Sequence, residues 1–222
     1  ESAMEACPAG WHLPDSTEWN ALFAAVGGIE SAGKSLKFTE GWRNGGNGTD
    51  EFGFSAFPVG ILYGSSEQSP KNEYASFWSS TENSEEGAYG MFLSYYGKGA
   101  KLGIDSKGAS FSVRCLKDSK LSSSSSVTVT SSSSSPETSV EASAPVVTES
   151  GTMTDSRDGR TYKTLTVGAW TWMAENLNYK TSDSYCFGDK AENCEKYGRL
   201  YTWDGMKDSS ALNSVQRLCP AG

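Results

Sequence analysis

The sequence contains one histidine, no Cys-x-x-Cys pair, and no apolar run of the about 18 residues that a membrane helix needs. The single histidine, His12, stands between Trp11 and Leu13 before a predicted helix, where we expect a structural or surface role and no catalysis. Without further such ligands, zinc is not expected. Basic residues are also few: 19 Lys and Arg stand against 27 Asp and Glu, giving a net charge of −8, and they form no stripe. Nucleic acid is therefore not an expected partner, and no membrane insertion is expected.

The motif Cys-Pro-Ala-Gly occurs twice, at Cys7–Gly10 and at Cys219–Gly222. Only the first copy continues into Trp11-His12-Leu13-Pro14. This pattern indicates a window cut from a tandem array. We expect residues 1–117 to be the C-terminal half of one repeat and residues 150–222 to be the N-terminal half of the next. A signal peptide or anchor is expected only upstream of residue 1.

Residues 118–149 differ from the rest in composition. They include the serine runs Ser122–Ser126 and Ser131–Ser135 and contain no aromatic residue. Such a segment buries too little apolar surface to offset its chain entropy. We predict a Ser/Thr-rich flexible linker of the kind that separates extracytoplasmic modules and can carry O-linked sugars.

The sequence has five cysteines, so one would be left over in an oxidising compartment. Cys219 occupies the same repeat position as Cys7, and we expect it to be unpaired because its partner lies beyond the last residue. Cys186 and Cys194 are close enough to close a short loop. Cys7 and Cys115 would tie together the ends of the first segment. Reduced, buried thiols in a cytosolic protein are the alternative.

Local patterns predict a helix and several strands. Asp15 and Glu18 form a capping-box pattern, and the apolar spacing that follows predicts a helix over residues 16–26. Alternation predicts strands over residues 52–57, 110–116 and 161–167, and a hairpin of residues 89–96 and 101–105. A weaker helical stretch is expected over residues 30–37. Because the second segment lacks a long amphipathic helix and the first lacks opening strands, the two together make one α+β domain of about 180 residues. We expect the second segment to be able to dock on the first as a permuted domain.

Six motifs stand in a fixed order once the second segment is read before the first. They are Trp172–Tyr179, Tyr197–Trp203, Cys7–Pro14 with Glu18-Trp19, Glu51–Ala56, Phe77–Glu82 and Val113–Cys115. In these motifs the sequence resembles the Fibrobacter succinogenes major paralogous domain family. The resemblance implies a secreted or surface-attached, often lipid-anchored, bacterial protein without a defined molecular activity.

Two of these motifs carry a wider resemblance. Trp11–Pro14 before an acid-capped helix, and Val113–Cys115, are similar to segments of the formylglycine-generating-enzyme fold, a variant of the C-type lectin fold. The resemblance implies small antiparallel sheets, one well-defined amphipathic helix and long loops. It implies architecture alone, because a fold does not determine an activity.

An oxidase of the formylglycine-generating type would need a reactive cysteine pair beyond the structural ones, and we expect no enzyme. Calcium, which lectin folds often bind, would find oxygen ligands in Asn47, Asp50, Glu82 and Asn83. Their spacing defines no motif, so no cofactor is expected.

The sequence is rich in aromatic residues, with seven Trp and ten Tyr. Flat amphipathic rings can stack on sugars while their polar atoms bond hydroxyls. Four tryptophans fall on apolar periodic positions and should be core: Trp11, Trp19, Trp78 and Trp172. Trp42, Asn44 and Asn47 instead lie in a Gly/Asn-rich loop, and Tyr95 and Tyr96 flank a turn. We predict the ligand site near these five residues; the alternative is that Trp42 packs under its own loop.

The leading hypothesis is a non-catalytic extracellular or cell-surface module, repeated along a bacterial protein, that binds polysaccharide or another surface ligand. Repetition suits weak binding because linked copies raise the effective concentration. The competing hypothesis is a structural or protein-docking domain without a sugar site. An enzyme of the formylglycine-generating type is the third hypothesis, which the use of the cysteines disfavours.

Overall fold

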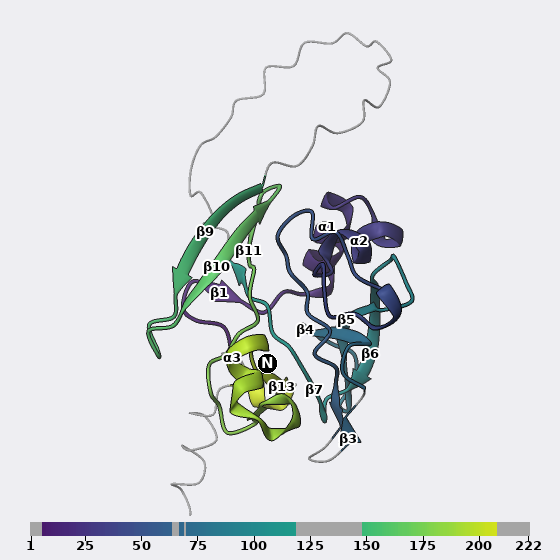
Figure 1. Ribbon diagram of the computed structural model, residues 1–222. Helices are drawn as coiled ribbons and strands as arrows, with labels where there is room; N and C mark the ends of the chain where they lie inside the picture. The colour runs from purple at the N-terminus through teal and green to yellow at the C-terminus, as the bar shows by residue number, and fades with distance from the viewer. Residues whose placement is uncertain (1–5, 64–66, 69, 119–147, 208–222) are drawn as a thin grey trace, which may run out of the picture.

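The structure, a computed structural model, describes residues 6–63, 67–68, 70–118 and 148–207, which form a mixed α+β fold of small antiparallel sheets (Figure 1). The strands are β1 (Trp11–His12), β2 (Leu62–Tyr63), β3 (Glu67–Gln68), β4 (Tyr74–Glu82), β5 (Gly87–Ser94), β6 (Lys101–Ser106), β7 (Ala109–Phe111), β8 (Leu116–Lys117), β9 (Thr148–Thr154), β10 (Thr161–Val167), β11 (Trp170–Met173), β12 (Ser184–Tyr185) and β13 (Leu200–Thr202). The α-helices are α1 (Ser16–Ala25), α2 (Ile29–Leu36) and α3 (Ala191–Tyr197), with short 3-10 turns at Arg43–Gly45, Phe187–Asp189 and Asp204–Met206. None of the helices in the described part of the chain is long and apolar enough to cross a membrane.

Two of the three sheets combine strands from both sides of the serine-rich segment. The first has the order β1-β8-β11-β10-β9, and its two halves join where Trp172 of β11 pairs with Leu116 of β8. The second has the order β12-β13-β7-β2-β3, with Tyr201 opposite Phe111. The third, β4-β5-β6, comes from the first segment alone. We call the contact between residues 6–118 and residues 148–207 the seam.

Helix α1 begins where the sequence predicts. The Asp15 carboxylate accepts hydrogen bonds from the backbone N–H groups of Thr17 at 2.7 Å and Glu18 at 2.8 Å, and the Glu18 carboxylate accepts one from the Asp15 N–H at 2.8 Å. This capping box satisfies N–H groups that have no partner inside the helix. The buried face of α1 carries Trp19, Leu22 and Phe23. The helix packs against β4 and β5.

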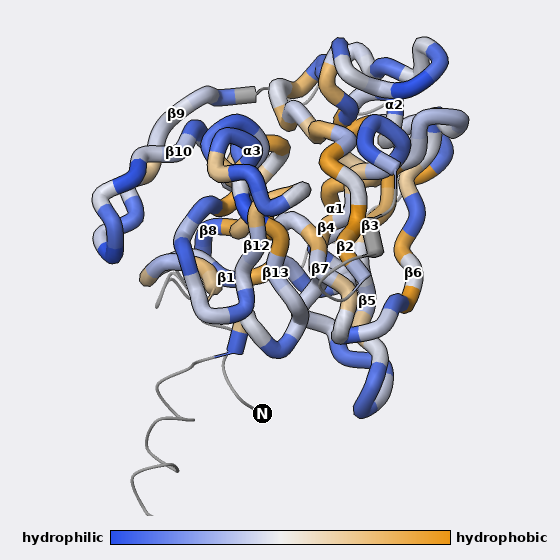
Figure 2. Tube along the Cα trace, turned by 60° about the horizontal axis from the view of Figure 1, so that its bottom comes forward, coloured by the Kyte–Doolittle hydropathy of each residue, from blue (hydrophilic) through white to orange (hydrophobic). Residues whose placement is uncertain are grey.

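Aromatic side chains from both segments share the core. The Trp19 ring lies 5.0 Å from the Trp172 ring, so α1 packs directly on β11 across the seam. In the second core, Trp78 stacks on Phe111 at 4.1 Å and donates its indole N–H to the carbonyl of Tyr201 at 2.7 Å. Figure 2 has hydrophobic colour along the central strands and hydrophilic colour at the tip of the β9–β10 hairpin. The tryptophans assigned to the core by sequence are buried, except Trp11, which is partly exposed.

Arg114 is the largest polar side chain in this core and is fully buried. Its Nε donates to Oδ1 of Asn176 at 2.6 Å, across the seam. Its two other nitrogens donate to the carbonyls of Phe54 at 2.6 Å, Ser55 at 3.1 Å and Met173 at 3.2 Å. Burial lowers the pKa of the guanidinium to about 9. Arg114 thus bonds a loop of the first segment to the strand end of the second.

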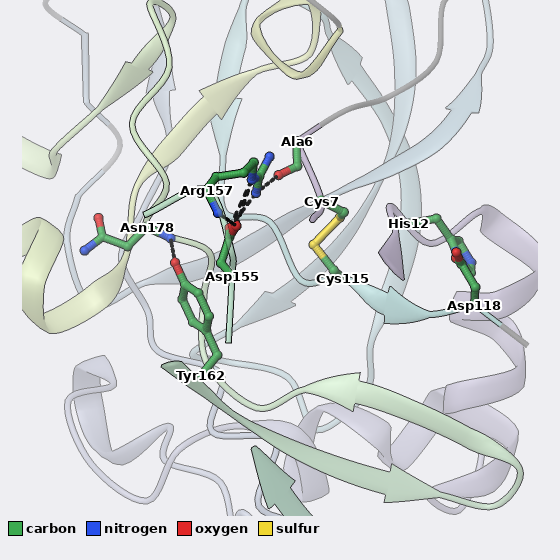
Figure 3. The surroundings of a disulfide bond; sticks show 9 residues. All are labelled: Ala6, Cys7, His12, Cys115, Asp118, Asp155, Arg157, Tyr162 and Asn178. Carbon is green, nitrogen blue, oxygen red and sulfur yellow. Dashed lines mark hydrogen bonds and ion pairs between the residues drawn. A yellow bond between two sulfur atoms is a disulfide. The ribbon is translucent and has the colours of Figure 1, made fainter. Parts of the chain in front are cut away.

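The described part of the chain contains two disulfide bonds, Cys7–Cys115 and Cys186–Cys194. Figure 3 shows Arg157, from the second segment, reaching toward the chain beside Cys7, where it donates to the carbonyl of Ala6 at 2.8 Å. The same guanidinium pairs with the buried carboxylate of Asp155 at 2.6 Å. The two disulfide bonds are the ones expected from the sequence, and Cys7–Cys115 lies beside the seam.

The structure differs from the sequence expectation in three elements. Residues 52–57 form a loop, because Gly53 and Ser55 adopt left-handed φ angles of 72° and 51° that interrupt extended backbone. The strand expected over 110–116 is split into β7 and β8, and the stretch between them turns Arg114 into the core. Helix α2 matches the weaker helical stretch predicted over residues 30–37, whereas α3 was not predicted. Cys219 and nearly all of the predicted linker, 118–149, lie outside the described residues.

Candidate ligand-binding site

Trp42, the loop tryptophan expected to face a sugar, is buried with 5% of its surface exposed. Its ring packs with the larger core, and the Lys37 ammonium lies 4.9 Å from the ring centroid. The core packing and the Lys37 ammonium leave no exposed ring face on Trp42 for a sugar. This agrees with the alternative, in which Trp42 packs under its own loop. The prediction failed because small neighbours in sequence were taken for exposure, whereas the loop folds over its own tryptophan.

Lys37 holds this loop against the turn that follows β5. Its buried ammonium donates to the carbonyls of Gly46 at 2.7 Å, Gly97 at 2.9 Å and Ser94 at 3.1 Å. Burial lowers the pKa of this ammonium. The three carbonyls and the Trp42 ring replace much of the water that a lysine ammonium loses on burial. The two loops named by the sequence analysis are therefore neighbours and are fixed to each other.

The two predicted asparagines differ in their roles. Asn47 is exposed, but its side-chain oxygen accepts a hydrogen bond from the Trp42 N–H at 3.1 Å and so closes the loop. Asn44 is exposed and has a left-handed φ of 51°, a conformation that asparagine tolerates better than most residues. The structure assigns neither asparagine to a hollow of the surface.

The two predicted tyrosines lie side by side at the end of β5. Their rings are 5.3 Å apart and nearly perpendicular. Tyr96 is 75% exposed, the most exposed large apolar side chain among the described residues. Tyr95 is half-buried, and the Arg43 guanidinium lies 5.8 Å from its ring while pairing with the Glu73 carboxylate. Tyr96 is thus the predicted residue that is free to contact a ligand.

Tyr96 lines a groove of about 620 Å³ between the β4-β5-β6 sheet and β2. Two further tyrosines line it, Tyr63 on β2 and Tyr74 at the start of β4. The charged residues among its described lining are Lys101 and Asp105, both on β6. Ile104 on the same strand is 52% exposed. An aromatic, partly apolar groove with a few polar groups is the usual form of a ligand site.

The groove continues the tyrosine pair as a row of phenols. At one end the Tyr63 hydroxyl donates to the Asp105 carboxylate at 3.2 Å. Burial is the main cause that raises the pKa of Tyr63, and the negative charge of Asp105 raises it further. Burial raises the pKa of Tyr74, and the neighbouring Tyr96 and Tyr95 raise it further. The phenols are therefore close enough to interact. We call this set the tyrosine row; in spatial order it is Asp105, Tyr63, Tyr74, Tyr96, Tyr95 and Arg43.

Sequence reasoning missed four members of the row: Tyr63, Tyr74, Asp105 and Arg43. The predicted hairpin could have indicated Asp105, because alternation along β6 puts Lys101, Gly103 and Asp105 on one face. That signal gives no indication of which strand lies opposite. The pairing of β2 with β7, which brings Tyr63 there, joins residues far apart in the chain.

The residues considered for calcium and for catalysis make other contacts. The Asp50 carboxylate accepts hydrogen bonds from the Ser55 N–H and hydroxyl, both at 2.6 Å, and Glu82 forms an ion pair with Lys107. No group of three or more His, Cys, Asp or Glu side chains that could hold a metal occurs among the residues described. His12 lies between Glu18 at 2.9 Å and Asp118 at 2.6 Å.

The chain was compared with protein-family models, curated proteins and solved structures. The model of the Fibrobacter succinogenes major domain matches residues 1–117. No curated protein and no solved structure matches the chain, so the likeness to C-type lectins and to the formylglycine-generating-enzyme fold stays a prediction. The family match covers more than half of the chain, and it includes the segment that contributes Arg114, Cys7 and every member of the tyrosine row. The chain belongs to the Fibrobacter succinogenes major domain family.

Proposed function

We propose that this protein is a non-catalytic module of an extracytoplasmic or cell-surface protein, and that it binds polysaccharide through the groove. The observation that carries the proposal is the tyrosine row. Three tyrosines line a groove of about 620 Å³, and the most exposed of them, Tyr96, is one that the sequence singled out. A carboxylate and an ammonium stand on one wall, where they can bond hydroxyl groups.

The physical argument concerns what an exposed tyrosine can do. An exposed phenol ring offers an apolar face, and sugars have apolar C–H faces that such a ring can cover. The phenol hydroxyls bond the sugar hydroxyls at the edge of the same contact. Each contact is weak, so a module repeated along one chain gains avidity from linked copies.

The proposed location follows from the cysteines. Disulfide bonds persist in oxidising compartments and are rare in the cytosol. Cys7–Cys115 and Cys186–Cys194 support an extracytoplasmic location. The family resemblance supports it too, because it implies a secreted or surface-attached protein. We also propose that the module lacks enzymatic activity, since the carboxylates named above serve hairpin and loop contacts.

The test is affinity electrophoresis of the full chain through gels that contain soluble glucans and hemicelluloses. Retardation is expected in at least one gel. Replacing Tyr96 with alanine should weaken this retention about tenfold, the loss of one stacking contact. The matched control is Tyr89→Ala, because Tyr89 lies on β5 but does not line the groove.

Unretarded migration of the folded protein on every polymer would contradict the proposal and favour the competing hypothesis, a structural or protein-docking domain. Equal losses for Tyr96→Ala and Tyr89→Ala would show that the sugar is bound elsewhere.

A further inference from the structure

The charges of the groove compensate each other. Among the described residues that line it, the charged ones are Lys101 and Asp105, which have opposite signs and both stand on β6. At the far end of the tyrosine row, Arg43 is paired with Glu73. An anionic ligand would therefore be repelled by Asp105, and a cationic ligand would be repelled by Lys101. Neither ligand would find an excess of opposite charge among these two residues. A neutral ligand meets neither obstacle.

The hydrogen-bonding capacity of the wall suits hydroxyl groups. One oxygen of Asp105 accepts from the Ser106 N–H at 2.8 Å, and the other accepts from the Tyr63 hydroxyl at 3.2 Å. A carboxylate has about four acceptor positions, so capacity is left on both oxygens. Sugar hydroxyls can donate to them in charge-assisted hydrogen bonds without bringing a charge of their own.

Tyr63 and Tyr74 stay neutral at physiological pH. The pKa of Tyr63 and that of Tyr74 are both raised, first of all by burial. Their hydroxyls can then both donate and accept, as sugar hydroxyls do. Gly103 lies on the same face of β6, and a Cβ atom there would come within 3.3 Å of the Phe92 ring. The missing side chain leaves the groove floor open to a flat ring.

We propose that the groove selects neutral polysaccharides over polymers of uronic acids and over polymers of amino sugars. This inference rests on the proposed function and narrows its substrate class. Stacking on Tyr96 supplies most of the contact, hydroxyl donation to Asp105 orients the chain, and the separate, opposite charges of Lys101 and Asp105 disfavour charged chains of both signs.

The test compares three polymers that share a β-linked backbone and differ in charge: hydroxyethyl cellulose, carboxymethyl cellulose and glycol chitosan. The full chain is run through each at low and at high salt. Raising the salt from about 0.1 M to about 1 M shortens the screening length from about 10 Å to about 3 Å and removes attraction caused by the negative net charge of the protein. Retention on the neutral polymer is expected to change less than twofold between the two conditions.

Three outcomes are distinguishable. Salt-resistant retention on the neutral polymer alone supports the inference. Salt-resistant retention that is stronger on either charged polymer overturns it but leaves polysaccharide binding in place. Absence of retention on all three, repeated on the wider panel described above, contradicts the proposed function itself.

A charge-neutral variant sharpens the assignment to Asp105. Asp105→Asn keeps the shape but loses the charge, and we expect about tenfold weaker retention on the neutral polymer because the hydrogen bonds are no longer charge-assisted. Glu40→Gln, at an exposed position outside the groove, changes the net charge equally and should have no effect. An Asp105→Asn variant that binds the neutral polymer as well as the parent protein would remove Asp105 from the site.

Discussion

The seam and the groove are built from different parts of the same sequence. The six motifs that carry the family resemblance supply the seam: Trp172 packs on Trp19, Trp78 bonds the Tyr201 carbonyl, and Arg114 bonds Asn176. The groove contains no residue from those motifs; Tyr63, Tyr74, Tyr96 and Asp105 all fall between them. The motifs therefore identify the fold, and the residues between them line the groove that we propose as the ligand site. We expect members of the family to share the fold and to differ in the residues that line the groove.

The largest effect that separates the two regions should come from the disulfide at the seam. In the chain-entropy account, Cys7–Cys115, with a sequence separation of 108, stabilises the fold by about 5 kcal/mol, and Cys186–Cys194, with a separation of 8, by about 2–3 kcal/mol. Replacing each pair with serines, in a Cys219→Ser background, tests this by urea unfolding. A larger loss from the short-range pair would contradict the greater stabilisation expected from Cys7–Cys115.

The next effect concerns Arg114. Arg114→Met removes the donors for Asn176 and for the carbonyls of Phe54, Ser55 and Met173, and leaves buried acceptors without partners. The free energy of unfolding should fall by about 3 kcal/mol or more. Arg160→Met is the matched control, because Arg160 pairs with the exposed Glu195 and its loss should cost at most about 1 kcal/mol. Equal costs would contradict the role given to Arg114.

The smallest effect is a pH dependence at His12. Hydrogen bonds to Glu18 and then Asp118, against partial burial, raise its pKa from 6.5 to about 9. A raised pKa in the folded state means that the protonated ring stabilises the fold. That contribution is complete below pH 6.5 and is lost as the pH rises through about 9. The His12 side chain is 38% exposed and that of Asp118 is 54% exposed, so solvent screening limits the gain to about 1 kcal/mol.

Thermal unfolding on both sides of this range measures the contribution of His12. The parent protein should lose more stability between pH 6.5 and pH 9 than His12→Gln does. If both lose the same amount, the pH dependence arises elsewhere. Retention on polysaccharide gels should not change with His12→Gln while the protein stays folded, because His12 does not line the groove.

The sequence predicted local elements better than distant contacts. Helix α1 with its capping box, strand β10 and the β5–β6 hairpin depend on residues a few positions apart, and the structure has them. Strands of two or three residues, such as β2 and β7, show no alternation long enough to detect. Their places are decided by what they pair with.

The candidate site was harder to predict than the fold. Tyr96 was found because an aromatic pair beside a glycine turn indicates an exposed ring. Trp42 was misjudged because sequence gives no sign that Lys37 and the core would cover its two faces. Arg114 falls within the continuous strand predicted over residues 110–116. In the structure the backbone leaves the extended strand between β7 and β8, and this turns the Arg114 side chain into the core. Burial of a single side chain depends on what folds over it, and that lies far away in the chain.

Lys37 has a consequence for how this surface could work in different media. Its ammonium gathers carbonyl oxygens from two loops, much as a calcium ion does in other loop-rich folds. Unlike an ion, it is tethered to the chain and cannot be removed by dilution or by a chelator. The loop that carries Tyr96 is therefore set in position at the moment of folding, whatever mineral content its surroundings offer.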